Sequence, residues 1–494
     1  MLEPLPGNQW TTATAAHLMN RAGFGGSPQD IENLRQMGLS KAVSWFVDYE
    51  KIPDNTPAPD WSQLDPQLLA TREAIRNAAD PQTRQMLQQQ QYQEENSQMA
   101  DLRYWWIRRM ALGPRPFQEK MTLFWHGHFA TSFEKVRTPY FLWLQNETLR
   151  QHATGNFNEL LIAASEDPAM LLYLDGANSH KDKPNENFAR EVMELFTLGE
   201  GNYTEQDIKE AAKAFTGYRL RPNGDFVFAP RQHDEGEKTV FGQTGNFDGD
   251  QVIDLAYRTP AAGAFVPHEL VKFYLSDTML PREYLSALGD RWRTEGNYSL
   301  RWLAQRFFGS ALFFAPEFRG NFIKSPVQFY LGLMQDLELD VVPAPRLVVN
   351  PLRQMGQVLF YPPNVRGWLG GRNWVNSASL AARRSAVENL FAPLNERTMN
   401  QDELIDLVAA HTSGEDVFTV ENERFSILAS LDPADATRHL VSALLPVKPP
   451  ASFNSALESF LHGADPAPAA AVEKTRRLRR ATIALLQSPE YQLC

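Results

Sequence analysis

Residues 81–112 read PQTRQMLQQQQYQEENSQMADLRYWWIRRMAL, and this stretch decides the fold class. Pro81 suits the first turn of a helix, no later proline interrupts the run, and Gly113-Pro114 follows as a stop. Glutamine is a good helix former, so the Gln-rich part reads as an ordered helix with a wet face rather than as low-complexity sequence. We therefore expect one long helix from Pro81 to about Gly113.

Helix-start signals recur on both sides of this stretch. Ser27-Pro28-Gln29-Asp30 combines an N-cap residue, a proline at the first helical position and an acid at the third. Residues 204–207, TEQD, repeat the cap and the acid, and Gly217 follows as a stop. The density of these signals predicts a mainly α-helical protein, with helix above about 45% of residues, where roughly one third is usual.

One segment near residues 217–242 departs from the helical pattern. Residues 218–228 alternate in polarity and contain Asn223-Gly224, a pair typical of hairpin turns. A second turn-rich stretch, residues 233–238, precedes a short apolar run at 239–241. We expect a small β-hairpin or a three-stranded ribbon, inserted in a large multi-helical single domain.

Length and composition fit a soluble globular protein with a large core. The chain has 494 residues, of which 43% are hydrophobic and 22% are charged, which is close to the usual balance. Residues 1–394 are expected to form a helical core that carries the hairpin, and residues 395–494 a C-terminal helical part packed on it. No apolar run approaches the length that spans a bilayer, so we expect no membrane insertion.

The net charge and the cysteine count limit which ligands, metals and cellular compartments we expect. The net charge of −11 argues against a nucleic-acid partner, because phosphate binding needs clustered Lys and Arg; it favours neutral or sugar-like ligands. The one cysteine, Cys494, excludes internal disulfides and Cys-based metal clusters. The first residues lack the basic and apolar regions of a signal peptide, so we expect a cytoplasmic protein as written, or a periplasmic one if a leader was removed. The oligomeric state is left open.

The densest polar stretch begins at Asp175 and continues into a helix expected from Asn185 to Gly199. At 100° per residue, its long polar side chains fall within an arc of about 100°, opposite an apolar side that faces the core. The side chains in this arc are those of Asn187, Arg190, Glu191 and Glu194. We expect Asn185, Glu186, Arg190 and Glu191 to form a buried or cleft-lining network; the alternative is an exposed face with ion pairs worth about 0.3 kcal/mol each.

These acids are the candidates for catalysis. Glu191 and Glu194 repel each other, so one of them can keep its proton to higher pH, as a general acid needs, although Arg190 would oppose that shift. The working pair is expected to combine Glu191 or Glu194 with an acid from another segment, Asp234 first of all. The catalytic candidates are thus Glu191, Glu194, Asp234 and Glu186.

Two further segments supply binding candidates. His233 and Asp234 lie on a tight turn, where they can act as base or ligand or simply stabilise the turn. The glycine- and proline-rich residues 361–376 carry arginine and tryptophan, which stack on sugars and clamp anions, or alternatively pin the loop by burial. The substrate-binding candidates are Asn185, Asn187, Arg190, Arg231, His233, Arg366, Trp368 and Trp374.

A metal site is the alternative chemistry. His126-Gly127-His128 has the spacing of many metal ligands, but the preceding residues read as helix, where the two rings diverge by about 200°. We therefore expect no metal and no cofactor. The alternative is a metal-dependent hydrolase with the ligands His126, His128, His233 and Asp234. No phosphate-binding loop, dinucleotide fingerprint or nucleophile elbow occurs in the sequence.

Several of these residues belong to longer motifs. They are HLMNRAGFGG at 17–26, KMTLFWHGHF at 120–129, PNENFARE at 184–191, RQHD at 231–234, FDG at 247–249, KSP at 324–326, PPNVRGW at 362–368 and SPEY at 488–491. With these motifs the sequence resembles, over nearly its whole length, the bacterial family catalogued as domain of unknown function eighteen hundred. The resemblance implies one helical domain and brings no established activity. Members often carry export signals, which this sequence lacks, and are often encoded beside sulfatase-like proteins, which hints at envelope or polysaccharide metabolism.

The resulting expectation is a hydrolase that acts on a carbohydrate-like or envelope polymer through a carboxylate pair, in the manner of a glycoside hydrolase. The alternatives are the metal-dependent hydrolase and a non-enzymatic binding or assembly protein. They differ in whether Glu191, His126, His233 and Trp368 line one open cleft.

Overall fold

The computed structural model describes residues 3–63, 66–277, 280–339, 345–392, 404–405, 408, 412, 423–463 and 470–494. The structure is 66% helical, with two small two-stranded antiparallel sheets. The expected mainly α-helical class with a small β insertion is therefore confirmed. The expected boundary at 394/395 lies outside the described residues. None of the described helices combines the length and the apolar composition that crossing a bilayer requires.

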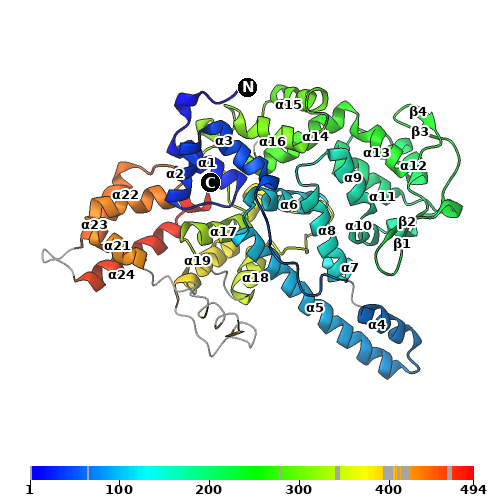
Figure 1. Cartoon of the computed structure of the whole chain (residues 1–494), viewed down its shortest axis with the longest axis horizontal. Helices are drawn as coiled ribbons and strands as arrows, with labels where there is room; N and C mark the ends of the chain where they lie inside the picture. The colour runs from blue at the N-terminus through cyan, green and yellow to red at the C-terminus, as the bar shows by residue number, and fades with distance from the viewer. Residues whose placement is uncertain are drawn as a thin grey trace.

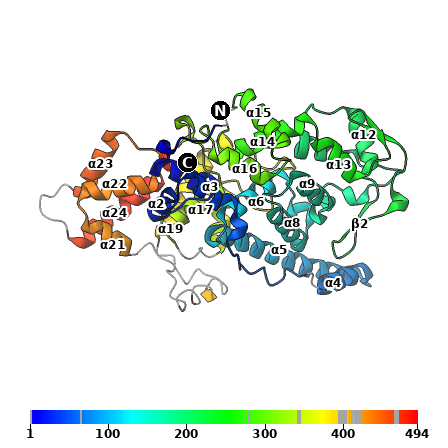
Figure 2. The ribbon, with the colours of Figure 1, turned by 45° about the horizontal axis from the view of Figure 1, so that its top comes forward.

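The long helix α5 (Pro81–Leu112) runs as predicted, capped by Asp80 and followed by Gly113. Its first half and α4 (Pro66–Asn77) pack along each other and project from the body in both ribbon views (Figures 1 and 2). Buried side chains begin only at Glu95, and Trp106 in the second half is fully buried. The Gln-rich sequence thus forms the solvent-exposed half of α5, and the other half of the helix lies in the core.

The centre of the molecule is α6 (Pro116–His128), whose residues from Phe117 to His126 are all buried. Helices from the first half of the chain surround it and share one hydrophobic cluster with it. These helices are α1 (Thr12–Ala22), α2 (Pro28–Met37), α3 (Leu39–Val47), α8 (Pro139–Gln151), α9 (Phe157–Glu166) and α10 (Pro168–Tyr173), whereas the buried residues of α7 (Phe133–Val136) belong to a second hydrophobic cluster. The start of α2 has the predicted capping box between Ser27 and Asp30.

The next section of the chain runs from the right-hand end of the molecule to its upper middle in Figure 1. Its helices are α11 (Glu186–Met193), α12 (Glu205–Ala214), α13 (Gly249–Tyr257), α14 (Pro260–Tyr274), α15 (Arg282–Thr294) and α16 (Leu300–Gly309). Between α12 and α13 lie two separate hairpins, β1 (Tyr218–Leu220) with β2 (Phe226–Phe228) and β3 (Lys238–Val240) with β4 (Gln243–Gly245). The predicted hairpin is present, and the 239–241 run starts a second hairpin rather than adding a third strand.

The last part of the chain packs around α17 (Pro326–Asp336). The remaining described helices are α18 (Pro345–Gln354), α19 (Ser377–Phe391), α21 (Glu423–Ser430), α22 (Pro433–Leu444), α23 (Ala451–His462) and α24 (Ala471–Leu486). They share a second hydrophobic cluster with α17 and the buried half of α5. The main chain returns to this centre, because Lys324 N donates to Gln492 O at 2.8 Å.

Candidate functional site

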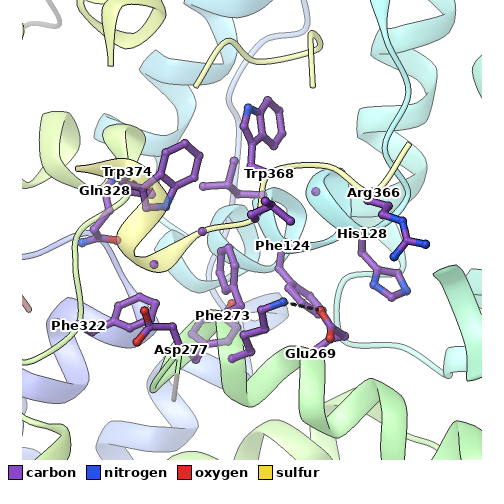
Figure 3. A pocket seen from close by; sticks show the side chains of 18 of the residues that line it. Phe124, His128, Glu269, Phe273, Asp277, Phe322, Gln328, Arg366, Trp368 and Trp374 are labelled. Carbon is purple, nitrogen blue, oxygen red and sulfur yellow. Dashed lines mark hydrogen bonds and ion pairs between the residues drawn. The ribbon is translucent and has the colours of Figure 1, made fainter. Parts of the chain in front are cut away.

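A cavity of about 300 Å³ opens where the two hydrophobic clusters meet (Figure 3). Its walls come from α6, from residues 194–200 after α11, from α14, from the start of α17 and from the loop 366–374. These segments are far apart in the chain, so only the packing of the two halves creates the space. A volume of this size lies at the lower end of the range for small-molecule sites.

The segment after α11 sets the position of Glu194. The α-helical hydrogen bonds end at Met193, and residues 194–198 form one wider π turn. Gly199 N donates to Glu194 O at 2.9 Å, and the Thr197 hydroxyl donates to Val192 O at 2.7 Å. Such single π turns occur frequently at functional sites because they re-aim side chains. Here Glu194 and Leu195 line the cavity, and Leu195 also packs against the first hydrophobic cluster.

Glu194 is held by two hydrogen-bond donors. Arg366 Nη2 lies 2.9 Å from one carboxylate oxygen, and the Tyr203 hydroxyl donates to the other. Burial, and after it Glu194, raises the pKa of Tyr203 to about 12. Both partners donate to the carboxylate and thereby fix its orientation.

A second acid, Glu269 on α14, lines the same cavity. Its carboxylate oxygens lie 3.8 Å from Lys272 Nζ and 3.6 Å from His268 Nδ1, so its contacts are looser than those of Glu194. His128 also lines the cavity, and its Nε2 lies 2.9 Å from Phe196 O. Burial lowers the pKa of His128, while the Phe196 carbonyl and Glu269 oppose that shift.

Aromatic rings cover the middle of the cavity. Figure 3 shows Phe124 and Phe273 between Arg366 and His128 on one side and Phe322 with Gln328 on the other. The loop above them approaches α6 closely at Gly367. This residue has φ of 69°, and any side chain there would collide with the main-chain oxygen of Gly127, so the approach requires glycine. This approach fixes the loop that carries Trp368 and Trp374, both of which border the cavity, and the Trp368 ring packs against His126 with 5.7 Å between the ring centres.

The structure therefore separates the predicted site residues. Those that line the cavity are Glu194, Arg366, Trp368, Trp374 and, from the metal alternative, His128. Glu191 is half-buried one turn before Glu194 and lies outside the lining. Burial, followed by Glu194, raises the pKa of Glu191, and Arg366 and Arg190 oppose this.

The start of α11 does not form the expected network. Asn185 caps the helix by accepting from Phe188 N at 3.1 Å, and its amide donates to Leu174 O at 2.9 Å. Arg190 pairs with the exposed Glu205 at 2.7 Å. Glu186 and Asn187 are exposed. Helix geometry places these groups on a stripe, but neighbouring segments cover only the end of the stripe that carries Glu191 and Glu194.

The RQHD motif builds the base of the first hairpin. His233 Nδ1 lies 2.9 Å from Thr216 O, and Asp234 N donates to the hydroxyl oxygen of the same residue, Thr216 Oγ1, at 2.8 Å. Arg231 is exposed. None of the three residues lines the cavity. His233 and Asp234 therefore act here as the turn-stabilising pair that the sequence left as an alternative.

The four histidine and aspartate ligands of the metal alternative do not converge. His126 Nε2 accepts from Phe360 N at 3.0 Å, and burial lowers the pKa of His126 to about 3. His128 lines the cavity, whereas His233 and Asp234 lie at the hairpin. Within the described ranges, no group of three or more His, Cys, Asp or Glu side chains is arranged to hold a metal ion.

The sequence alone did not predict that α14, α1 and the first half of α6 contribute residues to the cavity. The missed polar residues include Glu269, Lys272, Arg21 and Lys120. A usable signal existed for Lys120, because it is a lysine within the apolar run KMTLFW that reads as a buried helix. Glu269 had no such local signal.

The comparison with known families agrees with the motifs. Residues 17–493 match the family described as protein of unknown function (DUF1800). The chain belongs to this family. No curated protein and no solved structure matches it. The DUF1800 match covers the lining residues from Arg21 to Trp374, and of the lining only Cys494 lies outside it.

Proposed function

We propose that this DUF1800 protein is a hydrolase that binds a carbohydrate-like polymer in the cavity and cleaves it with the carboxylates of Glu194 and Glu269. The observation that carries the proposal is that these acids, from different segments, line one cavity with two tryptophans. The pair keeps the expected combination of an acid near α11 with one from elsewhere. Its second member is Glu269 in place of Asp234, which lies outside the cavity.

The environments of the two acids suit different roles. Glu194 accepts from Arg366 and Tyr203, which hold its carboxylate in position to serve as nucleophile or general base. Glu269 has only contacts longer than a hydrogen bond, at 3.6 and 3.8 Å, so it can exchange a proton with the leaving oxygen as general acid. Two carboxylates in different environments are the usual arrangement for glycoside hydrolysis.

The aromatic lining supports a ring-shaped ligand. Trp368 and Trp374 on the loop and Phe273 on α14 border the same space, and aromatic faces pack against the apolar faces of sugar rings. Arg366, whose side chain is 55% exposed, is accessible to a ligand hydroxyl as well as to Glu194. The residues proposed to bind the sugar therefore lie in the same cavity as the two acids proposed to cleave it.

The test is a panel of envelope and storage polysaccharides incubated with the full chain and assayed for new reducing ends. Glu194→Gln and Glu269→Gln are each expected to lower turnover by about 10²- to 10⁴-fold while ligand binding persists. Glu205→Gln is the matched control, because this exposed acid pairs with Arg190 outside the cavity, and it is expected to keep full turnover.

Trp368→Ala separates binding from chemistry, since it is expected to weaken binding of the cleaved glycan. Glycans that bind without being cleaved would overturn the hydrolase and favour a binding protein. If no glycan is bound or cleaved, the carbohydrate assignment itself is wrong. Turnover that needs an added metal and survives Glu269→Gln would favour the metal-dependent alternative.

A further inference from the structure

The loop 366–374 forms a roof over the cavity and contacts the walls at two buried glycines. At Gly367 a side chain would collide with the main-chain oxygen of Gly127 on α6. Gly371, with φ of 54°, lies against Asp277, an exposed residue beyond the end of α14, and a side chain there would collide with the carboxylate. The roof therefore spans the space from α6 to the wall that continues from α14.

The end of the cavity across from Arg366 is closed by side chains that bind one another. Figure 3 places Phe322 and Gln328 at this end. Gln328 is buried, and its side-chain oxygen accepts from the buried Lys120 on α6. The buried guanidinium of Arg21 on α1 lies 4.5 Å from the centre of the Phe322 ring. These side chains bond to protein atoms and pack together, so they form the inner end of the cavity.

The mouth of the cavity lies beside Glu194. Glu200, six residues further along the chain, is exposed and lines the cavity. Arg366, bonded to Glu194 at 2.9 Å, has a side chain that is 55% exposed, whereas the side chain of Glu194 is 12% exposed. The side chain of Glu269 is 26% exposed. Both acids thus lie just inside the opening, in front of the enclosed space beneath the tryptophans.

The enclosed space has the size of one sugar unit. Its volume of about 300 Å³ equals that of roughly ten water molecules at about 30 Å³ each. A single pyranose ring with its hydroxyl groups fills such a space, whereas several consecutive rings do not. A chain cannot be laid in sideways, because the roof is in contact with the walls at Gly367 and Gly371.

We propose that the site takes only the end of a glycan chain, so that the protein is an exo-acting hydrolase that removes one terminal unit at a time. This inference rests on the proposed hydrolase and specifies its substrate class as free chain ends. The terminal ring lies beneath Trp368 and Trp374, and the rest of the chain leaves the cavity past Glu194 and Arg366. The two acids at the mouth then reach the bond beside the inserted ring.

Each turnover cleaves the bond between the inserted unit and the rest of the chain. The bond between the anomeric carbon and the bridging oxygen breaks, and this oxygen takes a proton from Glu269. One water gives its hydroxyl group to the anomeric carbon and its remaining proton to Glu194, and exchange with solvent restores both acids. The products are one monosaccharide and a chain shorter by one unit. An open groove would instead release fragments of many lengths.

Binding of paired short and long glycans tests the proposal without turnover. The Glu194→Gln variant of the full chain is titrated calorimetrically with maltohexaose and amylose, with xylohexaose and linear xylan, and with chitohexaose and glycol chitin. We expect one bound protein per chain for both members of a pair that binds, because each chain has one end of the right kind. A number of bound proteins that grows with chain length would overturn the proposal, as would no binding by any pair.

The products of the wild type provide the second readout. The first products from a hexasaccharide that is cleaved are expected to be the monosaccharide and the pentasaccharide, which mass spectrometry distinguishes. Early formation of trisaccharides would overturn the exo-acting assignment and leave the hydrolase standing. One bound protein per chain without any cleavage would have the opposite meaning, since the hydrolase would fail and the chain-end site would remain.

A substitution in the roof tests whether the roof restricts entry. Gly371→Ala places a methyl group against the carboxylate of Asp277, so we expect the roof to lift, polymers to bind at internal positions and trisaccharides to form early. Gly242→Ala is the matched control: Gly242 also has a positive φ, 74°, but no described atom beyond its chain neighbours lies within 4 Å of the new methyl group. This control should keep one bound protein per chain.

The fold of Gly371→Ala is checked by circular dichroism. A folded Gly371→Ala protein that still binds once per chain would show that the roof does not restrict entry and would overturn the proposal. If the variant does not fold, the stoichiometry of the Glu194→Gln variant and the first products of the wild type decide.

Discussion

Asp167 is a buried acid whose two carboxylate oxygens have different surroundings. One oxygen caps α10 by accepting from Met170 N at 3.0 Å and also accepts from Gln145 at 3.1 Å. The other oxygen is buried without a partner. Burial raises the pKa of Asp167 to about 7, although these hydrogen bonds and the one from Ala169 N oppose the shift.

This raised pKa predicts a pH-dependent loss of stability. Between about pH 4, the unfolded pKa, and pH 7 the folded state binds more protons, so the free energy of unfolding falls as the pH rises. Asp167→Asn keeps an N-cap acceptor and cannot ionise. We expect it to be more stable than the wild type by about 1–3 kcal/mol at pH 8 and similar at pH 4. Urea unfolding of both proteins across this range checks the prediction, and parallel pH profiles would contradict it.

Among the secondary-structure elements, α12 and the second hairpin are joined through Asp207. One carboxylate oxygen completes the capping box with Thr204, and the other accepts from Phe241 N at 2.8 Å. Phe241 and Gly242 form the two-residue turn between β3 and β4, with φ of 49° and 74°. The sequence predicted this helix cap, but it did not predict that Asp207 also anchors the turn of the second hairpin.

Two substitutions distinguish the two roles of Asp207. Thr204→Ala removes only cap bonds and is expected to cost about 1 kcal/mol. Asp207→Ala also leaves Phe241 N without its acceptor and is expected to cost about 1–3 kcal/mol more. Hydrogen exchange should become faster at the amide of Phe241 only in Asp207→Ala. Equal effects of the two substitutions on both measurements would show that the hairpin does not depend on this contact.

At the scale of the whole molecule, a buried charge cluster ties α5, α6 and α8 together. Glu119 accepts from Arg109 Nε at 2.6 Å, from Arg150 Nε at 2.7 Å and from Trp106 Nε1 at 2.9 Å. Burial alone would raise the pKa of Glu119, but Arg150 and Arg109 outweigh it and lower the pKa. Glu119 is therefore charged in the folded protein at neutral pH. Its contribution to the free energy of unfolding is lost as the pH falls through this lowered pKa.

Removing the charge of Glu119 leaves two arginines without their shared partner. Glu119→Gln is expected to destabilise the protein by about 2–4 kcal/mol at neutral pH, because two buried arginines lose a shared partner, although Arg109 keeps Asp54 and Arg150 keeps Glu147. Glu147→Gln is the control, because Glu147 contacts Arg150 from a position that is 26% exposed, and it should cost at most about 1 kcal/mol. Urea unfolding measures both, and equal costs would show that the cluster is not a tie between the helices.

The sequence by itself determined the features whose interactions lie within a few residues of each other. The capping boxes at Ser27 and Thr204, the length of α5 and the hairpin around Asn223-Gly224 each depend on neighbouring side chains and local backbone geometry.

Only the tertiary structure decided which of these groups meet. The π turn re-aimed Glu194, and it depends on hydrogen bonds that compete closely with those of an ordinary helix. Glu269, rather than Asp234, shares the cavity with Glu194, and Arg21 and Lys120 lie beneath it. These contacts join residues that are far apart in the chain. No local pattern encodes them, because the packing of the two hydrophobic clusters determines which polar side chains remain beside the cavity and which are covered.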